Sequence, residues 1–233
     1  EDWREKRMEL HWDIGIRPEK LRFHEHENLS HYAEIAHDIQ YEFPTGWQEI
    51  EGIHSRTDFD LRRHQEYSGK KMEYFEQETR DRFIPYVVET SAGLDRTILM
   101  LLCEAYEEEE VDGDERTVLK LHPDVAPITA AVFPLVKNDP MQETAHAIVD
   151  DLREHVNAFY DERGSIGKRY RRQDETGTPF CITVDGQTAE DSTVTIRDRD
   201  SMEQVRVTTD QIVPWILDHK KDWERGEPAV PAS

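Results

Sequence analysis

The first half of the chain places short apolar runs between turn-forming residues, a pattern that predicts antiparallel strands. Asp38–Phe43 and Trp47–His54 are strand-like runs joined by Pro-Thr-Gly, a connection short enough to link two antiparallel strands. Amphipathic spacing predicts a helix within residues 1–16, and Leu94–Glu109 has the apolar spacing of a buried helix. Further strands are expected at 72–77 and 82–89, a helical turn at 18–21 and a partly helical stretch at 58–69.

In the second half, strand-like runs alternate with helical patterns. This alternation predicts a compact α/β domain with a mixed sheet flanked by helices. The expected strands are 128–136, 157–160, 179–184, 193–197 and 204–207, and the expected helices are 141–156, 166–174 and 209–223.

An acid-rich stretch separates the two patterns. Residues 107–115 read EEEEVDGDE, a composition typical of a linker or an exposed turn. We therefore predict an α+β domain built on an antiparallel sheet over residues 1–112 and an α/β domain over residues 113–226. The last residues, 227–233, are predicted to be a disordered tail.

The charge of the chain favours a protein that works in concentrated salt. Its 233 residues include 51 acids and 29 bases, for a net charge of −22, and most of the bases are arginine. Salt screens the mutual repulsion of the acids, so this balance suits a halophile; an ordinary acidic cytosolic protein is the alternative. Aromatic residues spread among clear strand and helix patterns argue against disorder.

Cysteine usage and hydropathy point to the cytoplasm. Cys103 and Cys181 lie in apolar runs, which predicts buried free thiols in a reducing compartment. No apolar run approaches the length of a membrane span, and no signal peptide is visible. The chain begins EDWREKRMEL without an initiator Met, so we expect it to be a piece of a longer protein.

Two carboxylates two residues apart on one predicted strand are the first candidate site. Glu49 and Glu51, in WQEIEGI, would point to the same face of the sheet. Two acids on a face that is otherwise Trp and Ile suit a cation, either an ammonium group or Mg²⁺. The alternative is a solvated outer face.

A turn of very small residues is the second candidate. Ser91, Ala92 and Gly93 follow Glu89 and lead into the apolar helix, so a ligand could approach the backbone closely there. Arg96 lies in the first helical turn, where the helix dipole disfavours a cation, and an anionic ligand would explain it. The alternatives are a structural turn and a surface ion pair of Arg96 with Asp95 or a nearby glutamate.

The densest positive cluster is the third candidate. Lys168, Arg169, Arg171 and Arg172 surround Tyr170, a combination that suits phosphate contact and base stacking. The alternative is a helix whose charges pair with neighbouring acids. His24, His26, His31 and His37 match no familiar zinc spacing and are expected to be scattered surface residues.

Several stretches in order resemble bacterial glycyl-tRNA synthetase of the homodimeric class II type. They are FPTGWQEIEGIHSRTDFDLRRHQEYSG, VVETSAGLDRTILMLL, GSIGKRYRRQDETGTPFCITVDG and TVTIRDRDSMEQVRV. The resemblance runs from about His31 to Trp215 and covers the C-terminal half of such an enzyme. It implies part of a class II antiparallel-sheet catalytic domain followed by an anticodon-binding domain.

This resemblance implies the substrates and assigns residues to them. ATP, glycine and tRNA(Gly) would be the substrates, with Mg²⁺ as cofactor and Glu49 as its candidate ligand; no residue is assigned beyond substrate positioning. SAGLDR is similar to the third class II motif, whose arginine stacks on adenine. The implied ATP-binding residues are Glu49, Ile50, Gly93, Leu94, Asp95 and Arg96. The implied glycine-binding residues are Glu51, Glu89, Thr90, Ser91, Ala92 and Gly93. Thr90 departs from the family, which usually has proline there.

For the second domain the resemblance implies recognition of single-stranded RNA. The candidate tRNA-binding residues are Lys168, Arg169, Arg171, Arg172, Arg197 and Arg199, although the RDRD segment at 197–200 could instead form an internal ion network. The whole enzyme would be a cytoplasmic homodimer.

The family's first two motifs are not in this chain, so we expect that the chain alone cannot activate glycine. A glycine-dependent ATP–pyrophosphate exchange signal from it would contradict this expectation.

A non-catalytic nucleic-acid-binding relative of class II synthetases is the competing interpretation. The accessory subunit of mitochondrial DNA polymerase is such a relative. Glu49, Glu89, Ser91 and Arg96 favour the enzyme, since a relative freed from catalysis would not need them.

Overall fold

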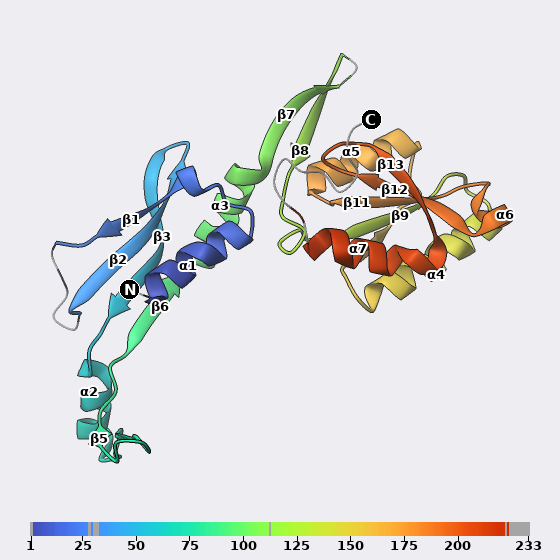
Figure 1. Cartoon of the computed structure of the whole chain (residues 1–233). Coiled ribbons are helices and arrows are strands. Elements are labelled where there is room, and N and C mark those ends of the chain that lie inside the picture. The colour runs from blue at the N-terminus through green and yellow to red at the C-terminus, as the bar shows by residue number, and fades with distance from the viewer. Residues whose placement is uncertain (1, 28, 30–32, 112, 222, 224–233) are drawn as a thin grey trace. The chain divides into compact units, whose positions relative to one another are not determined.

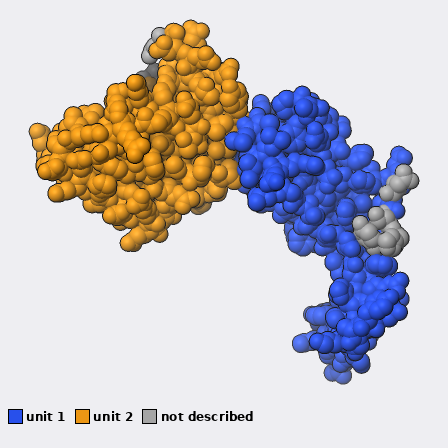
Figure 2. All heavy atoms as spheres, turned by 180° about the vertical axis from the view of Figure 1, so that it is seen from behind, with its two compact units in different colours: residues 1–103 blue, residues 104–233 orange. Residues whose placement is uncertain are grey.

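A computed structural model describes residues 2–27, 29, 33–111, 113–221 and 223. The chain divides into two compact units, residues 1–103 and 104–233 (Figure 2). The domain boundary expected at 112/113 falls inside a hairpin of the second unit, and the assignment of 1–112 and 113–226 to functional domains stays a prediction. The predicted tail, 227–233, lies outside the described residues. Within the described part, no helix is long and apolar enough to cross a membrane.

The first unit is built on a four-stranded antiparallel sheet with the order β1-β2-β3-β6 (Figure 1). The predicted strand pair at 38–54 is confirmed and joins at Gly46, whose φ of +103° favours glycine. The strands are β1 Leu21–Glu25, β2 Ile35–Phe43, β3 Gly46–Ser55 and β6 Val88–Ala92. Strand β1 was not predicted, because LRFHE contains too few apolar residues to show a strand pattern.

Two helices cover one face of this sheet. Met8 of α1 and Met100 of α3 pack into one core with Ile39, Tyr41 and Ile53 of the sheet. The helical elements of this unit are α1 Asp2–Asp13, η1 Pro18–Lys20, α2 Phe59–Ser68 and α3 Leu94–Ala105, the last of which ends just past the unit division.

Two expectations for this unit are corrected. The strands expected at 72–77 and 82–89 shrink to the short pair β4 Tyr74–Phe75 and β5 Arg82–Phe83, and β6 begins only at Val88. Helix α3 is only partly buried, because its apolar residues extend around more than the one face that meets the sheet. Met100 is fully buried, whereas Ile98 and Leu99 are about half exposed.

The acid-rich stretch forms an antiparallel hairpin, not the predicted linker or turn. Strands β7 Tyr106–Val111 and β8 Asp114–Leu119 pair along their whole length. Alternate acids meet cations: the Lys120 amine lies 2.7 Å from Glu107 and 2.6 Å from Glu109. The missed signal was the Asp-Gly dipeptide at 112–113, a sequence typical of tight hairpins; Gly113 has a φ of +85°.

The second unit has a five-stranded mixed sheet with helices on both faces, as predicted. The strand order is β10-β9-β11-β12-β13; the first three strands are parallel and the last two antiparallel. The strands are β9 Ala130–Pro134, β10 Ala158–Tyr160, β11 Phe180–Val184, β12 Thr193–Asp198 and β13 Gln204–Thr208. The helices are α4 Asp139–Arg153, α5 Ile166–Thr176, α6 Thr188–Asp191, η2 Thr209–Gln211 and α7 Ile212–Lys221.

The two faces of this sheet have separate cores. Helices α4 and α7 bury Val149, Leu152 and Ile216 against one face, and α5 packs Tyr170 against Ala131 and Cys181 on the other. Cys181 is a buried free thiol, as expected, and burial raises its pKa. Cys103, also free, is only half-buried.

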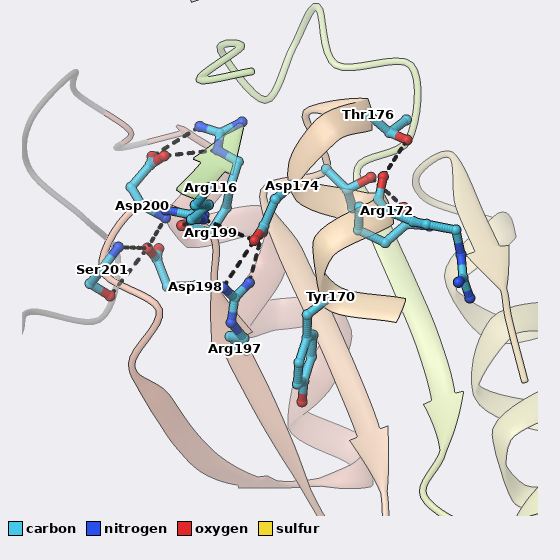
Figure 3. A network of polar contacts seen from close by, with 12 residues as sticks. Arg116, Tyr170, Arg172, Asp174, Thr176, Arg197, Asp198, Arg199, Asp200 and Ser201 are labelled. Carbon is cyan, nitrogen blue, oxygen red and sulfur yellow. Dashed lines mark hydrogen bonds and ion pairs between the residues drawn. The ribbon is translucent and has the colours of Figure 1, made fainter. Parts of the chain in front are cut away.

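A buried carboxylate, Asp174 of α5, joins three parts of the second unit (Figure 3). Asp174 is fully buried and accepts hydrogen bonds from Arg116 Nε of β8 at 3.0 Å and from Arg197 Nη1 of β12 at 2.9 Å. The Arg197 guanidinium also lies 4.8 Å from the centre of the Tyr170 ring. Burial by itself lowers the pKa of Arg116, but its bonds to Asp174 and Glu109 more than offset this, so the group stays charged.

The neighbouring Arg199 links chain segments that meet at the C-terminal end of α5. It donates to the carbonyl oxygens of Leu121 at 2.8 Å and Gly177 at 2.9 Å, and forms a bidentate pair with Asp200. Gly177 has a φ of +84°, and a Cβ there would lie 2.7 Å from Leu121 Cδ1. Only glycine fits this turn.

A second buried carboxylate, Glu51, ties β3 to α1 in the first unit. It is 1% exposed and accepts hydrogen bonds from Arg7 and from His11 Nε2 at 3.1 Å. Burial raises the pKa of Glu51, and the hydrogen bonds from His11 and Arg7 more than offset this, so the pKa lies below its usual value. Glu51 is therefore ionised within a buried charge cluster.

Substituting Asp174→Asn should destabilise the second unit by about 3–5 kcal/mol, because the buried Arg197 would lose its counter-charge and the buried Arg116 would keep only Glu109. Urea unfolding in molar KCl measures this. The matched control is Asp150→Asn, which alters an exposed pair with Arg153 and should change stability by less than about 0.5 kcal/mol. Equal losses of stability from the two substitutions would show that the buried ion pairs of Asp174 do not stabilise the second unit.

The stability of the first unit should depend on Glu51 ionisation. Because its folded pKa is lowered, Glu51 stabilises the fold fully above its unfolded pKa of about 4.3, and this contribution is lost as the pH falls toward the folded pKa. Glu51→Gln should lower stability at pH 7 by about 3 kcal/mol and flatten the acid limb of the pH–stability curve. Glu42→Gln, at a half-buried pair with Lys20, is the control; parallel acid limbs for wild type and Glu51→Gln would contradict the assignment.

Candidate functional site

The small-residue turn lies where β3 and β6 meet the start of α3. Strand β6 pairs with β3 so that Ser91 lies opposite Gly52 and Ala92 opposite Glu51. A cavity of about 490 Å³ opens beside this turn. It is lined by Glu49, Ile50, Ser91, Ala92, Gly93, Leu94, Asp95 and Arg96. The structure thus brings together all six residues implied for ATP and three of those implied for glycine.

Arg96 reaches across this cavity to the opposite strand. Its Nη1 donates to the backbone carbonyl oxygen of Glu49 at 2.6 Å. The Arg96 guanidinium therefore does not form the surface ion pair with Asp95 that the sequence left open. It pairs with no other carboxylate in the described part of the chain. No other partner of the Arg96 guanidinium occurs in the described part of the chain, so its remaining nitrogens and its flat face can meet an anion or a ring.

Polar groups gather on the outer face of β3 and β6, where a glycine leaves room for them. A Cβ on Gly52 would lie 3.3 Å from His54 Nε2 and 3.7 Å from Glu49 Oε1. Directly opposite residues in a strand pair point to the same side, so Ser91 and Glu89 share this face. The absence of a side chain at position 52 therefore keeps the centre of the polar face open.

Glu89 is held beside the cavity by a cationic partner. Its carboxylate accepts a hydrogen bond from Arg56 Nη1 at 2.6 Å and lies 3.7 Å from His54 Nδ1. Arg56 also binds Asp60 through two bonds, and these hydrogen bonds to Asp60 and Glu89 raise the pKa of Arg56. Thr90 is exposed and lies opposite Ile53, on the other side of the strand from Glu89.

The prediction that Glu49 and Glu51 share a face is wrong. The pairing of β2 with β3 shifts between Ile39, which lies opposite Glu51, and Gln40, which lies opposite Glu49. This β-bulge at Ile50 interrupts the alternation of side chains. Glu49 stays exposed on the cavity side, whereas Glu51 turns inward to Arg7 and His11 and does not line the cavity.

Among the six arginine and lysine residues expected to face RNA, three are buried. Arg169 is 2% exposed and donates to the carbonyl oxygens of Pro134 and Gly164. Arg197 and Arg199 belong to the Asp174 and Asp200 pairs, so the internal ion network weighed from the RDRD segment is present. Lys168 and Arg172 are exposed on α5 and Arg171 is half-buried, which leaves these three as the accessible candidates.

The histidines form no metal site within the described residues, where no cluster of three or more potential ligands occurs. His26 instead pairs with Asp38 at 2.7 Å, and its ring lies 5.4 Å from that of His24. His31 lies outside the described residues. At the cavity, Glu49 and Asp95 supply two carboxylates, which suits a magnesium ion that arrives with nucleotide phosphates, because such ions need only one or two protein carboxylates.

Comparison of the sequence with known proteins shows which proteins this chain is similar to. Residues 129–219 match the family described as "Anticodon binding domain", which coincides with the mixed-sheet unit. The glycine–tRNA ligase of Treponema denticola is 51% identical over 231 residues, covering 96% of this chain and 51% of that protein. The glycine–tRNA ligase of Chlorobaculum tepidum is 56% identical over 208 residues, 89% of this chain and 44% of that protein.

A third relative, the glycine–tRNA ligase of Caldanaerobacter subterraneus, is 50% identical over 221 residues, 94% of this chain and 48% of that protein. The chain therefore spans about half the length of the curated relatives it matches. Both halves of the chain take part in these matches, since up to 96% of it is covered. Together these matches confirm the resemblance to bacterial glycyl-tRNA synthetases that the sequence motifs indicated.

Proposed function

We propose that the chain is part of a glycine–tRNA ligase, which activates glycine with ATP to glycyl-adenylate and transfers it to the 3′ end of tRNA(Gly). The observation that carries this proposal is identity of about one half, along nearly the whole chain, to relatives with that name. The cavity between β3 and the start of α3 supports it, because it gathers the residues that the resemblance assigns to the substrates.

In this proposal the nucleotide occupies the cavity beside Arg96. The guanidinium, held in place by the Glu49 carbonyl oxygen, offers its face to the adenine ring. Gly93 and the first turn of α3 let the nucleotide approach the backbone, since a Cβ at Gly93 has nothing nearer than 3.9 Å. Glu49, with Asp95 near it, would hold the Mg²⁺ that accompanies the phosphates.

The glycine would bind where β6 ends, among Ser91, Ala92 and Gly93. The small side chains of this turn leave room for glycine. The backbone of the same turn would exclude the Cβ of any larger amino acid by steric contact. Glu49 and Glu89 supply negative charge toward the ammonium group, and Thr90 lies next to Glu89 on the opposite side of β6. The buried Glu51 would support this wall from behind, by holding β3 against α1.

The chemistry needs no nucleophile from the protein. The glycine carboxylate attacks the α-phosphorus of ATP in line and pyrophosphate leaves. The site contributes by positioning the reactants and by stabilising the charge that spreads over the phosphate oxygens. The intact cavity favours this enzyme over a non-catalytic nucleic-acid-binding relative, which would not need Glu49 and Arg96 in these positions.

The second unit would bind the tRNA anticodon loop through Lys168, Arg171 and Arg172. These exposed or half-exposed cations lie on α5 in a protein of net charge −22, which repels RNA as a whole. Salt would screen this long-range repulsion, so that the local attraction of the α5 cations for phosphates can act. We further propose that the whole enzyme is a cytoplasmic homodimer and that its source is a halophile.

Titration with RNA tests this function. In molar KCl, a glycine-tRNA anticodon stem-loop should bind at least about tenfold more tightly than the same stem-loop with its two anticodon cytosines replaced, because a wrong base costs about 1–3 kcal/mol. Fluorescence anisotropy of an end-labelled stem-loop measures both affinities. Equal affinity for the two RNAs, or none for either, would contradict sequence-specific recognition by this chain.

A further inference from the structure

The second unit contains a cavity of about 730 Å³, and of the residues so far assigned to RNA only Arg172 lines it. It lies along the edge of the sheet, between β10, the loop after β10 and the C-terminal part of α5. Its wall includes the aromatic Phe159, the acids Asp161 and Glu162, the cations Arg163 and Arg172, and Thr176. Its volume falls within the range of ligand pockets, about 300–1,000 Å³.

Phe159 forms an aromatic surface in this cavity because of its place in the sheet. It lies opposite Ala131 of β9, which in turn lies opposite Cys181 of β11, so all three side chains point to the face covered by α5. Ala131 and Cys181 are buried under the helix, whereas Phe159, on the edge strand, is 42% exposed. The helix thus stops short of Phe159 and leaves its ring open.

Two arginines stand beside this ring. Arg172 donates through Nη2 to Asp161 at 2.5 Å and to the carbonyl oxygen of Arg163 at 2.7 Å, which fixes its guanidinium at the wall. It points away from the buried Asp174 (Figure 3). Arg163 is exposed and forms no ion pair within the described residues, so its charge is available.

A buried, ionised partner keeps this wall in place. Asp161 is 7% exposed and also accepts a hydrogen bond from the Arg163 backbone N–H at 2.8 Å. Burial raises the pKa of Asp161, but its hydrogen bonds to Arg172 and to the Arg163 backbone more than offset this and lower the pKa overall. The loop and the helix are thereby held at a fixed separation around the cavity.

We propose that this cavity binds one unpaired nucleotide of an RNA loop, with the base stacked on Phe159 and the phosphate facing Arg163 and Arg172. Single-stranded bases splay out and stack on aromatic rings and guanidinium planes, and this cavity offers both. Arg163 forms no ion pair within the described residues, while the Arg172 guanidinium is held by Asp161; their positions at the wall favour a phosphate over an apolar peptide. The inference rests on the proposed tRNA function and deepens it by naming the site.

The test uses the glycine-tRNA anticodon stem-loop with a fluorescent base analogue at each unpaired position in turn. Wild-type chain should quench the analogue at one position. Phe159→Ala should weaken binding about tenfold, the effect of losing one stacked base, and abolish that quenching. Phe159→Trp should preserve both. Tyr106→Ala removes an exposed aromatic residue of the same unit outside the cavity and should change neither.

A charge pair completes the design. Arg163→Ala should weaken binding and reduce its salt dependence, whereas Arg153→Ala, at an exposed arginine of α4 outside the cavity, should not. If wild-type chain binds no stem-loop, the proposed function itself fails. If wild type binds but Phe159→Ala behaves like Tyr106→Ala, or Arg163→Ala like Arg153→Ala, only this inference is overturned. Should Phe159→Ala not fold, the Phe159→Trp and Arg163→Ala comparisons decide.

Discussion

Asp174 is the buried charge around which the second unit is organised. Its carboxylate accepts hydrogen bonds from one arginine of β8, in the β7–β8 hairpin, and from another of β12, in the mixed sheet, and it lies on α5, which covers one face of that sheet. Burying these three charges is costly unless each is paired, so the pairing holds β8, β12 and α5 together in the folded unit. Arg197 and Arg199, which the sequence suggested for RNA binding, are held in buried ion pairs. Lys168, Arg171, Arg172 and Arg163 are not part of these pairs. The basic residues of this unit therefore fall into two classes, those held in buried ion pairs and those outside such pairs.

The first unit uses a similar device for a different purpose. Glu51 is drawn inward to Arg7 and His11 by the bulge at Ile50, and this leaves Glu49 alone on the outer face. The bulge therefore converts two neighbouring acids into one structural and one accessible carboxylate. Gly52, immediately after them, keeps the polar face open so that Ser91, Glu89 and Glu49 can surround a small ligand.

Much of this architecture could be predicted from periodicity. The strand pair joined at Gly46, helices α4 and α5 and the five strands of the mixed sheet all have clear local patterns. The residues of the first cavity were also predicted, through a resemblance carried by contiguous motifs.

Features that depend on pairing between distant residues could not be predicted. Spacing alone places Glu49 and Glu51 on one face, because a bulge appears only when the partner strand is known. The Asp-Gly dipeptide signalled a turn after the glutamates of β7, but their pairing with Arg116 of β8 and with Lys120 just after it shows only in the folded hairpin. Phe159 looked like one strand residue among others; its exposure follows from the edge position of β10, which strand order alone decides.

The central claim is that the second unit recognises the RNA while the first holds the small substrates. Amide hydrogen exchange of the chain in molar KCl, with and without the glycine-tRNA anticodon stem-loop, tests this claim directly. Slower exchange is expected in residues 159–173, around β10 and α5, with no change in residues 89–96. Protection confined to residues 89–96, or absent from the second unit while the RNA is bound, would contradict it.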